Sequence, residues 1–350
     1  MPFWLYKSFT ENSFLLSMQG ESLNKNYSIE DIKQELSLKL DNDAIRGLTV
    51  LQDGRIAYMK TDTSIHILNP KDNFKETAST QGLETIPSKF NAGFTVGSLC
   101  TLSNGNIASF HETDEVDIYS INENTLTKIH TISSAIFCAQ RKSVKVNLVP
   151  LPGNKFSFIT DYDRKKISIW KGDAPYQNEP LKEIELNENI SSYFPLKDKN
   201  VIVVVFDNNK RILVDIETGN TIETLESNKK AKGKGCFLYD ADTLVIGNYF
   251  YNLKDKTWKD YTEVPDKQDC INNFDGGLKL RGNRILMVNN DYDYDSEDIQ
   301  DPNYHFRLFE PFKKDYGKQK IEELPNYEFV TINEETFALW NKQTLYVYKY

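Results

Sequence analysis

The amino-acid sequence predicts an all-β fold, a seven-bladed β-propeller made of four-stranded antiparallel blades. Three observations predict it: a hairpin unit recurs along the chain, a third alternating strand follows each copy, and the last copy ends one strand short. Units of about 40 to 50 residues with four strands each are typical of propeller blades. A closed ring grows by adding blades, so a chain of 350 residues fits one such domain.

The recurring hairpin unit consists of two apolar strands and a tight turn. Its clearest copies contain Asp53–Gly54, Asn104–Gly105 and Pro152–Gly153 between apolar runs. We expect type I′ turns there, because Asp-Gly and Asn-Gly pairs tolerate the positive φ that this turn needs at both central residues. With four weaker copies included, the turn positions are 53, 104, 153, 198, 240, 282 and 334, which lie 42 to 52 residues apart.

A third strand with alternating apolar residues follows each hairpin. These strands are expected at 65–68, 116–119, 167–170, 212–216, 250–253, 306–309 and 345–348. Alternation places one face of each strand against the neighbouring blade. Fourth strands, more polar, are expected at 126–132, 181–186 and 221–225. Charged outer strands keep an exposed sheet edge from pairing with another molecule.

The last unit reaches Tyr350 after only three strands, so its fourth strand has to come from elsewhere. Residues 34–40 precede the first unit and are similar in pattern to the fourth strand at 181–186. We predict that 34–40 pairs with the C-terminal strand, which closes the ring and removes an open edge. The propeller then spans 34–350, and residues 1–33 form an N-terminal extension that packs on it.

Aspartates recur in the turns before the third strands, and one of those strands ends in tryptophan. These residues are Asp62, Asp114, Asp163, Asp207 and Trp170. In period and strand pattern the chain resembles the WD40 family over roughly residues 34–350. It departs from that family where Leu68, Tyr119 or Phe309 takes the Trp place and where no Gly-His pair opens a unit. The resemblance implies a rigid disk whose loop-lined faces bind peptides or proteins.

Composition argues against two classes of partner. The net charge of −9 disfavours nucleic acid, since phosphate binding needs clustered Lys and Arg. The basic clusters at 164–166 and 229–234 fit solvated loops. No apolar stretch approaches the length of a membrane span, and no basic segment with a long apolar run opens the chain. We therefore expect a monomer that binds neither nucleic acid nor membrane.

The four cysteines indicate a reducing compartment. They are Cys100, Cys138, Cys236 and Cys270, and they form no CxxC pair. Widely spaced cysteines of this kind are expected to be buried reduced thiols, so a cytoplasmic protein is predicted. The chain is also rich in Asn, Lys and Ile, as proteins from AT-rich genomes are. A secreted bacterial effector that is translocated into a host cell and engages host proteins is therefore an alternative.

An acidic insertion at 289–301 is the strongest candidate in the sequence for a chemical site. Asp291, Asp293 and Asp295 have the every-second-residue spacing of calcium loops. Ser296 stands in place of the turn Gly and Pro302 in place of the bidentate Glu, so a solvated or partner-binding loop is favoured over a cation site. The four histidines, at positions 66, 111, 130 and 305, show no metal-ligand spacing. We expect no metal and no cofactor.

The predicted function is a non-enzymatic scaffold that binds a protein or peptide. Contacts are expected in the turns before the third strands and in the lead-ins to the first strands, where aromatic side chains and Arg are the usual anchors. The candidate contact residues are Phe94, His111, Thr113, Tyr162, Arg164, Tyr193, Phe194, Phe206, Phe274 and Tyr292. The alternative is an enzyme of hydrolase or lyase type, with titratable residues from several blades converging in the central channel.

Overall fold

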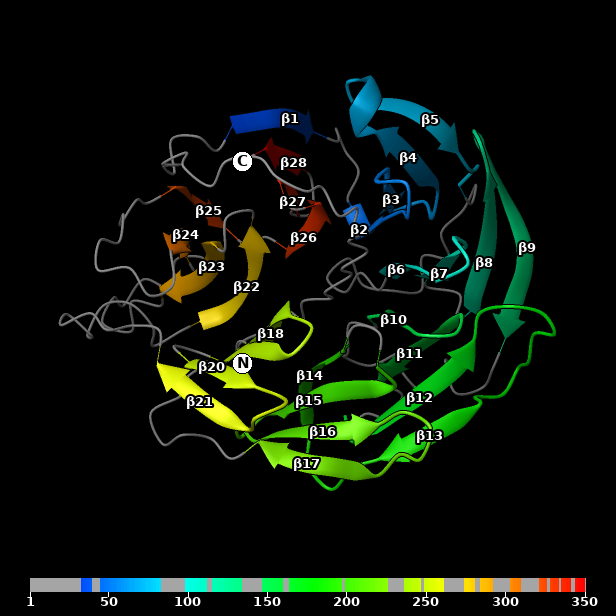
Figure 1. The fold of residues 1–350 in the computed structure, drawn as a ribbon. Helices are drawn as coiled ribbons and strands as arrows, with labels where there is room; N and C mark the ends of the chain where they lie inside the picture. The colour runs from blue at the N-terminus through cyan, green and yellow to red at the C-terminus, as the bar shows by residue number, and fades with distance from the viewer. Residues whose placement is uncertain are drawn as a thin grey trace, which may run out of the picture.

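The protein is an all-β propeller whose four-stranded antiparallel blades are arranged around a common centre (Figure 1). The computed structural model describes residues 33–39, 45–82, 98–111, 115–133, 147–159, 164–196, 199–225, 236–246, 249–260, 274–280, 284–291, 303–309, 321–325, 328–333, 335–340 and 344–349. Within these residues no helix has the length and apolar character of a membrane span.

The blades of the first half of the chain each use four consecutive strands. One sheet contains β2 (Ile45–Val50), β3 (Ile56–Lys60), β4 (Ile65–Asn69) and β5 (Lys75–Ser79), with a short 3-10 turn, η2 (Pro70–Asp72), between the last two. The next contains β6 (Ser98–Thr101), β7 (Ile107–His111), β8 (Glu115–Asn122) and β9 (Thr125–Ser133). The following sheet contains β10 (Val149–Leu151), β11 (Lys155–Ile159), β12 (Lys166–Lys171) and β13 (Lys182–Glu185).

The second half repeats this order. One sheet contains β14 (Ile190–Pro195), β15 (Val201–Phe206), β16 (Arg211–Asp215) and β17 (Thr221–Leu225). The next contains β18 (Cys236–Asp240), β19 (Thr243–Ile246), β20 (Tyr249–Asn252) and β21 (Thr257–Asp260). The following sheet contains β22 (Phe274–Leu280), β23 (Arg284–Asp291), β24 (Asn303–Phe309) and β25 (Ile321–Pro325). The first strand of each sheet lies toward the centre and the fourth lies at the periphery (Figure 1).

The remaining sheet combines strands from opposite ends of the described chain. It contains β26 (Glu328–Asn333), β27 (Thr336–Trp340), β28 (Thr344–Lys349) and, at its outer edge, β1 (Lys33–Lys39). β1 runs antiparallel to β28, with Leu38 opposite Leu345. This confirms the predicted strand exchange, with β1 beginning one residue before the predicted segment. Residues 1–32 lie outside the described residues, as does the contact predicted for the N-terminal extension.

The hairpin turns are tight, but two of them differ from the predicted type. At 51–55 the Gly54 amide donates to the Leu51 carbonyl at 2.9 Å, and only Gly54 has a positive φ, of 86°. Gly105, with φ of 85°, repeats this geometry in the next sheet. This is a type I turn followed by one left-handed glycine. The type I′ expectation is wrong there because the Asp or Asn keeps a negative φ and only the glycine takes the left-handed conformation.

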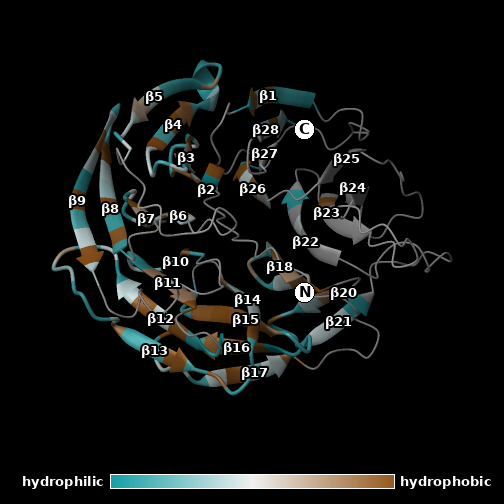
Figure 2. Ribbon diagram, turned by 180° about the vertical axis from the view of Figure 1, so that it is seen from behind, coloured by the Kyte–Doolittle hydropathy of each residue, from teal (hydrophilic) through white to brown (hydrophobic). Residues whose placement is uncertain are grey.

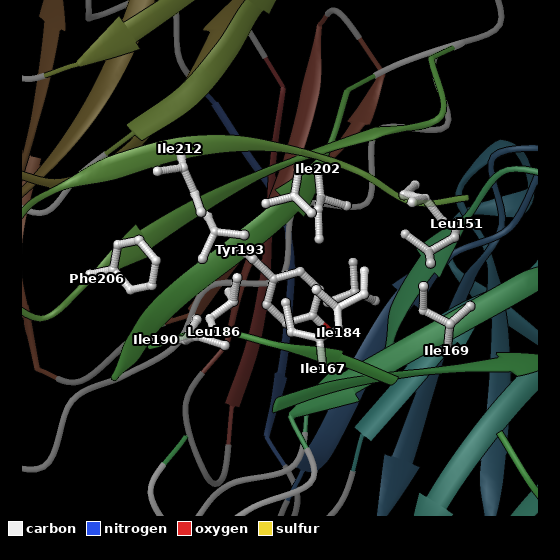
Figure 3. Close-up of a cluster of buried hydrophobic side chains, with 14 residues drawn as sticks. Leu151, Ile167, Ile169, Ile184, Leu186, Ile190, Tyr193, Ile202, Phe206 and Ile212 are labelled. Carbon is white, nitrogen blue, oxygen red and sulfur yellow. The ribbon is translucent and has the colours of Figure 1, made fainter. Parts of the chain in front are cut away.

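Apolar side chains fill the space between adjacent sheets. Both faces of a blade are therefore buried, and β15 is hydrophobic along most of its length, whereas β9 and β13 alternate in hydropathy (Figure 2). One such cluster joins the sheets β10–β13 and β14–β17, where Tyr193 lies among Ile167, Ile184 and Ile202 (Figure 3). Burying this much apolar surface between rigid sheets is the main source of stability in such a ring.

Two of the cysteines can be located in this core. Cys100 and Cys236 are buried and free, as the sequence predicts for reduced thiols. Burial raises the pKa of the Cys236 thiol to about 12, so the side chain is held as a neutral thiol. Cys138 and Cys270 lie outside the described residues.

Candidate functional site

The contacts predicted from the sequence fall in two kinds of connection, the lead-ins to the first strands and the turns before the third strands. In an antiparallel four-stranded blade, the lead-in to the first strand and the turn between the second and third strands lie at the same end of the sheet. The other two turns lie at the opposite end. We call the first end the candidate face and the second end the opposite edge of the disk. Its described parts include residues 60–64, 164–166, 186–190 and 206–211.

Arg164 joins two blades on this face. Its backbone has a left-handed φ of 54°, and its carbonyl accepts a hydrogen bond from the Ile190 amide at 2.7 Å. Its guanidinium Nη2 donates to Asp207 Oδ2 at 2.5 Å. Because Arg164 belongs to the sheet β10–β13 and Asp207 to the sheet β14–β17, this ion pair spans the seam between blades. The side chains remain 21% and 37% exposed.

A second ion pair lies beside the first. Lys210 Nζ donates to Glu188 Oε1 at 2.6 Å, and Asn208 Nδ2 donates to Glu188 Oε2 at 2.5 Å. The Lys210 hydrogen bond, reinforced by that of Asn208, holds the pKa of the Glu188 carboxyl below its usual value. Lys210 Nζ also lies 5.6 Å from the centre of the Phe206 ring. Charged groups of both signs are thus fixed in place over the connection 186–190 and the turn 206–211.

The structure separates the predicted contact residues into three groups. Arg164 lies on the candidate face as expected. Tyr193, Phe194 and Phe206 are only 6%, 4% and 3% exposed, so they are packing residues and present no surface for a partner. The expectation fails for them because both faces of a blade are covered by neighbours, so aromatic side chains near a strand end turn into the core.

The third group consists of residues whose side chains are outside the described part of the structure. His111 is the last residue of β7 and Phe274 the first of β22, which places their backbones at the candidate face. Phe94, Thr113, Tyr162 and Tyr292 lie outside the described residues, as does the acidic insertion beyond Asp291.

A chain of four hydrogen-bonded polar side chains lies in the sheet β2–β5, and none of its members is among the predicted contact residues. Ser64 Oγ donates to Asp62 Oδ1 at 2.5 Å and contacts His66 Nε2 at 2.9 Å. His66 Nδ1 lies 2.9 Å from Glu76 Oε2. The His66 ring also stacks on Tyr58, with centroids 5.1 Å apart. The every-second-residue spacing of Asp62, Ser64 and His66 is the signal for one shared side of a strand.

This chain has the order of a nucleophile, a base and an acid, but its geometry favours a structural role. Ser64 is 3% exposed, and its hydroxyl proton is directed to Asp62 rather than to the imidazole. A nucleophilic serine needs its proton taken by the base and needs access to substrate. We call this chain of Asp62, Ser64, His66 and Glu76 the clasp, because it ties the turn before β4 to the outer strand β5.

The opposite edge of the disk is held by polar contacts between successive hairpin turns. Gln52 Nε2 donates to the Ser103 carbonyl at 2.7 Å, and Ser103 Oγ donates to Asn154 Oδ1 at 2.8 Å. Further along, Lys199 Nζ donates to Asp242 Oδ1 at 3.0 Å. Each contact joins one blade to the next. The polar side chains of the opposite edge therefore mainly hold successive blades at a fixed spacing.

The strongest pKa shifts belong to buried groups between blades. Burial raises the pKa of the Tyr193 phenol, which is hydrogen-bonded to Ser157, and that of the Tyr119 phenol, which adjoins Asp117. These shifts follow from packing and do not converge on one cavity. Among the described residues, no group of three or more His, Cys, Asp or Glu side chains is arranged to hold a metal ion.

Comparisons with known proteins leave the family open. No family model matches the chain, and no curated protein matches it either.

Proposed function

We propose that this protein is a non-enzymatic scaffold that binds a protein or peptide through the candidate face. We further propose that each four-stranded sheet is one blade, seven in all, of a closed ring similar to WD40 propellers. The observation that carries the proposed function is the Arg164–Asp207 pair, a partly exposed, preorganised arginine at the seam between two blades.

The Arg164 side chain is already held in place before a partner binds. Partner binding costs free energy when long side chains must be ordered, and a side chain already fixed by an ion pair avoids part of this cost. Arg164 is held both by its backbone carbonyl and by its guanidinium. Arginine also contributes strongly at interfaces because it combines charge with a large planar surface.

The neighbouring groups suit a polypeptide partner. Glu188 and Lys210 place a carboxylate and an ammonium beside the Arg164–Asp207 pair. Mixed charges of this kind match the mixed donors and acceptors of a peptide better than a uniformly charged phosphate chain, in keeping with the net charge of −9. We propose that the protein acts as a monomer in the cytoplasm, either of its own cell or, as a secreted bacterial effector, of a host.

A matched pair of arginines tests the proposal. Peptides selected from a random display library against the intact protein would be measured for binding to Arg164→Ala and Arg55→Ala variants. Arg55 is the control because it pairs with Asp53 at 2.7 Å on the opposite edge. We expect Arg164→Ala to weaken binding about tenfold or more and Arg55→Ala to leave it unchanged.

Photo-crosslinkers then locate the contact without changing an ion pair. One would replace the exposed Asn187 on the candidate face and the other the exposed Asp255 on the opposite edge. Crosslinks from position 187 alone are expected. If crosslinks came mainly from position 255, or if Arg55→Ala abolished binding, the opposite edge would be the binding surface and the proposal would be wrong.

A further inference from the structure

The clasp needs more protons than neutral side chains supply. Its three side-chain contacts join Asp62 to Ser64, Ser64 to His66 and His66 to Glu76. Each requires one hydrogen between its two heavy atoms. The Ser64 hydroxyl has a single proton, and it is directed to the Asp62 carboxylate. The Ser64 oxygen can therefore take part in the second contact only as an acceptor.

Both ring nitrogens of His66 consequently act as donors. Nε2 has to donate to Ser64 Oγ, and Nδ1 has to donate to the Glu76 carboxylate, because neither oxygen has a hydrogen to offer. A neutral imidazole carries one ring proton, whereas the imidazolium carries two. Of the groups in the clasp, imidazole is the one that takes up a proton most readily near neutral pH.

The described surroundings supply two negative charges and one positive charge. Asp62 and Glu76 flank the ring through the contacts above, one from the turn and one from β5. On β3, Tyr58 stacks on the ring, and Lys60 lies two residues further along the same side of the strand. On the neighbouring blade, β1 turns Leu36 and Leu38 toward the apolar cluster that contains Tyr58. The two carboxylates outnumber the one ammonium around the imidazole.

We propose that His66 is a pH-sensitive latch whose imidazolium form closes the outer half of the sheet β2–β5. The number of ring protons on His66 decides how these contacts change with pH. With both ring protons present, all three contacts form and the turn 60–64 is tied to β5. As pH rises and His66 loses one proton, either the Ser64 contact or the Glu76 contact is lost. The turn belongs to the candidate face, but the latch does not depend on the proposed function.

Nitrogen NMR of the histidine rings tests the latch directly. Ring 15N shifts distinguish the imidazolium from both neutral tautomers. In the folded protein near neutral pH, we expect both ring nitrogens of His66 to be protonated, because each has an oxygen acceptor. His130, which stacks on Tyr176 with centroids 4.1 Å apart, is the internal reference for the ring nitrogen shifts.

Two variants establish which contacts are responsible. Ser64→Ala removes the acceptor that requires a proton on Nε2, and Glu76→Gln removes one flanking charge. In each variant we expect one protonated ring nitrogen on His66 where the unmodified protein shows two, while the other blades keep their spectra. A Ser133→Ala change at the end of β9, where Ser133 Oγ donates to Glu115 at 2.8 Å, is the control and is expected to leave His66 unchanged.

Amide exchange reports the mechanical consequence. The Thr80 amide donates to the Ile65 carbonyl at 2.9 Å, beside the clasp. Its protection is expected to fall about tenfold as His66 deprotonates, the loss of one charge-assisted hydrogen bond, while protection in the sheet β14–β17 stays constant. A His66 ring with a single protonated nitrogen in the folded protein near neutral pH would overturn the proposal, as would protection at Thr80 that does not change when His66 loses a proton.

Discussion

Two neighbouring blade interfaces solve the same packing problem with different side chains. Between the sheets β6–β9 and β10–β13 the core is aromatic: Phe110, Phe158 and Trp170 are fully or almost fully buried, and the Phe158 and Trp170 rings stack with centroids 6.0 Å apart. Between β10–β13 and β14–β17 the core is aliphatic, dominated by Ile, Leu and Val around Tyr193 (Figure 3). One sheet, β10–β13, contributes to both.

The difference shows that a blade interface requires a filled volume rather than particular residues. On the aromatic side, the bulky rings face small residues such as Cys100 and Ala108. On the aliphatic side, β-branched residues from both sheets interdigitate. Cores tolerate such exchanges when total volume and patterning are kept. A blade can therefore form without a tryptophan in its third strand, and Trp170 is the one tryptophan in the third strands that the structure describes.

The largest loss of stability is expected from a substitution of Trp170, the largest side chain in the aromatic interface. Trp170 and Ile169 are adjacent on β12 but face the aromatic and the aliphatic core respectively. Trp170→Ala should lower the free energy of unfolding by about 3 to 5 kcal/mol, because a rigid aromatic core collapses poorly around the cavity. Urea denaturation followed by circular dichroism would measure it. If Ile169→Ala cost more, the aromatic interface would not be the more demanding one.

A smaller loss is expected in the aliphatic core. Ile202 is 1% exposed and packs beside Tyr193 (Figure 3). Ile202→Ala should cost about 2 to 4 kcal/mol and Ile202→Val about 0.5 to 1.5 kcal/mol, in proportion to the methyl groups removed. The same denaturation experiment applies. Equal losses for the two variants would show that this interface responds to something other than filled volume.

The hydrogen bond inside the aliphatic core should matter less than its packing. Tyr193 OH lies 3.0 Å from Ser157 Oγ, and both residues are buried. Tyr193→Phe should cost about 1 kcal/mol, since it removes one buried hydrogen bond and keeps the ring. Ser157→Ala should cost a similar amount, and the double variant should cost less than their sum because the partners share one interaction. Additive losses in this cycle would contradict the contact.

The smallest effect is expected where the same two blades meet at the surface. Lys155 Nζ lies 2.7 Å from Glu217 Oε1, joining the sheets β10–β13 and β14–β17. Glu217→Gln should cost less than about 1 kcal/mol, because solvent screens an exposed pair and its long side chains must be ordered. The loss should shrink further in high salt. A large, salt-independent loss would mean that the surface contact carries the interface.

Local signals in the sequence predict the strands well because strand and turn chemistry are local. Asp53–Gly54 and Asn104–Gly105 mark real turns, although the turn type differs, and residues 34–39 of the predicted segment 34–40 lie in the outer strand β1. Exposure is harder to predict. Tyr193 and Phe194 are adjacent and point to opposite faces, yet both are buried, because each face of a blade has a neighbour. Alternation therefore cannot separate a contact residue from a core residue here.

The candidate site likewise has parts that local sequence patterns predict and parts that depend on long-range packing. Arg164 was predictable as a turn residue next to a third strand, and Asp207 as one of the recurring turn aspartates. Their pairing across the seam depends on the spacing of two blades, which no local pattern encodes. Half of the clasp could be predicted from the sequence, since Asp62, Ser64 and His66 follow one another at every second residue from the turn into β4. Glu76 joins them only through the register of β4 with β5.

The pairing of β1 with β28 sets the order of events during synthesis. Tyr348 OH donates to Gln34 Oε1 at 3.5 Å across 314 residues of sequence. While the ribosome is still making the blades between them, β1 has no partner strand and Leu36 and Leu38 have nothing to cover them. The blades made earlier therefore form an open ring until residues 344–349 have left the ribosome and can pair with β1. Because contacts between such distant segments form slowly, the longest-lived folding intermediate should be an unclosed ring, and chaperones should encounter this protein in that form.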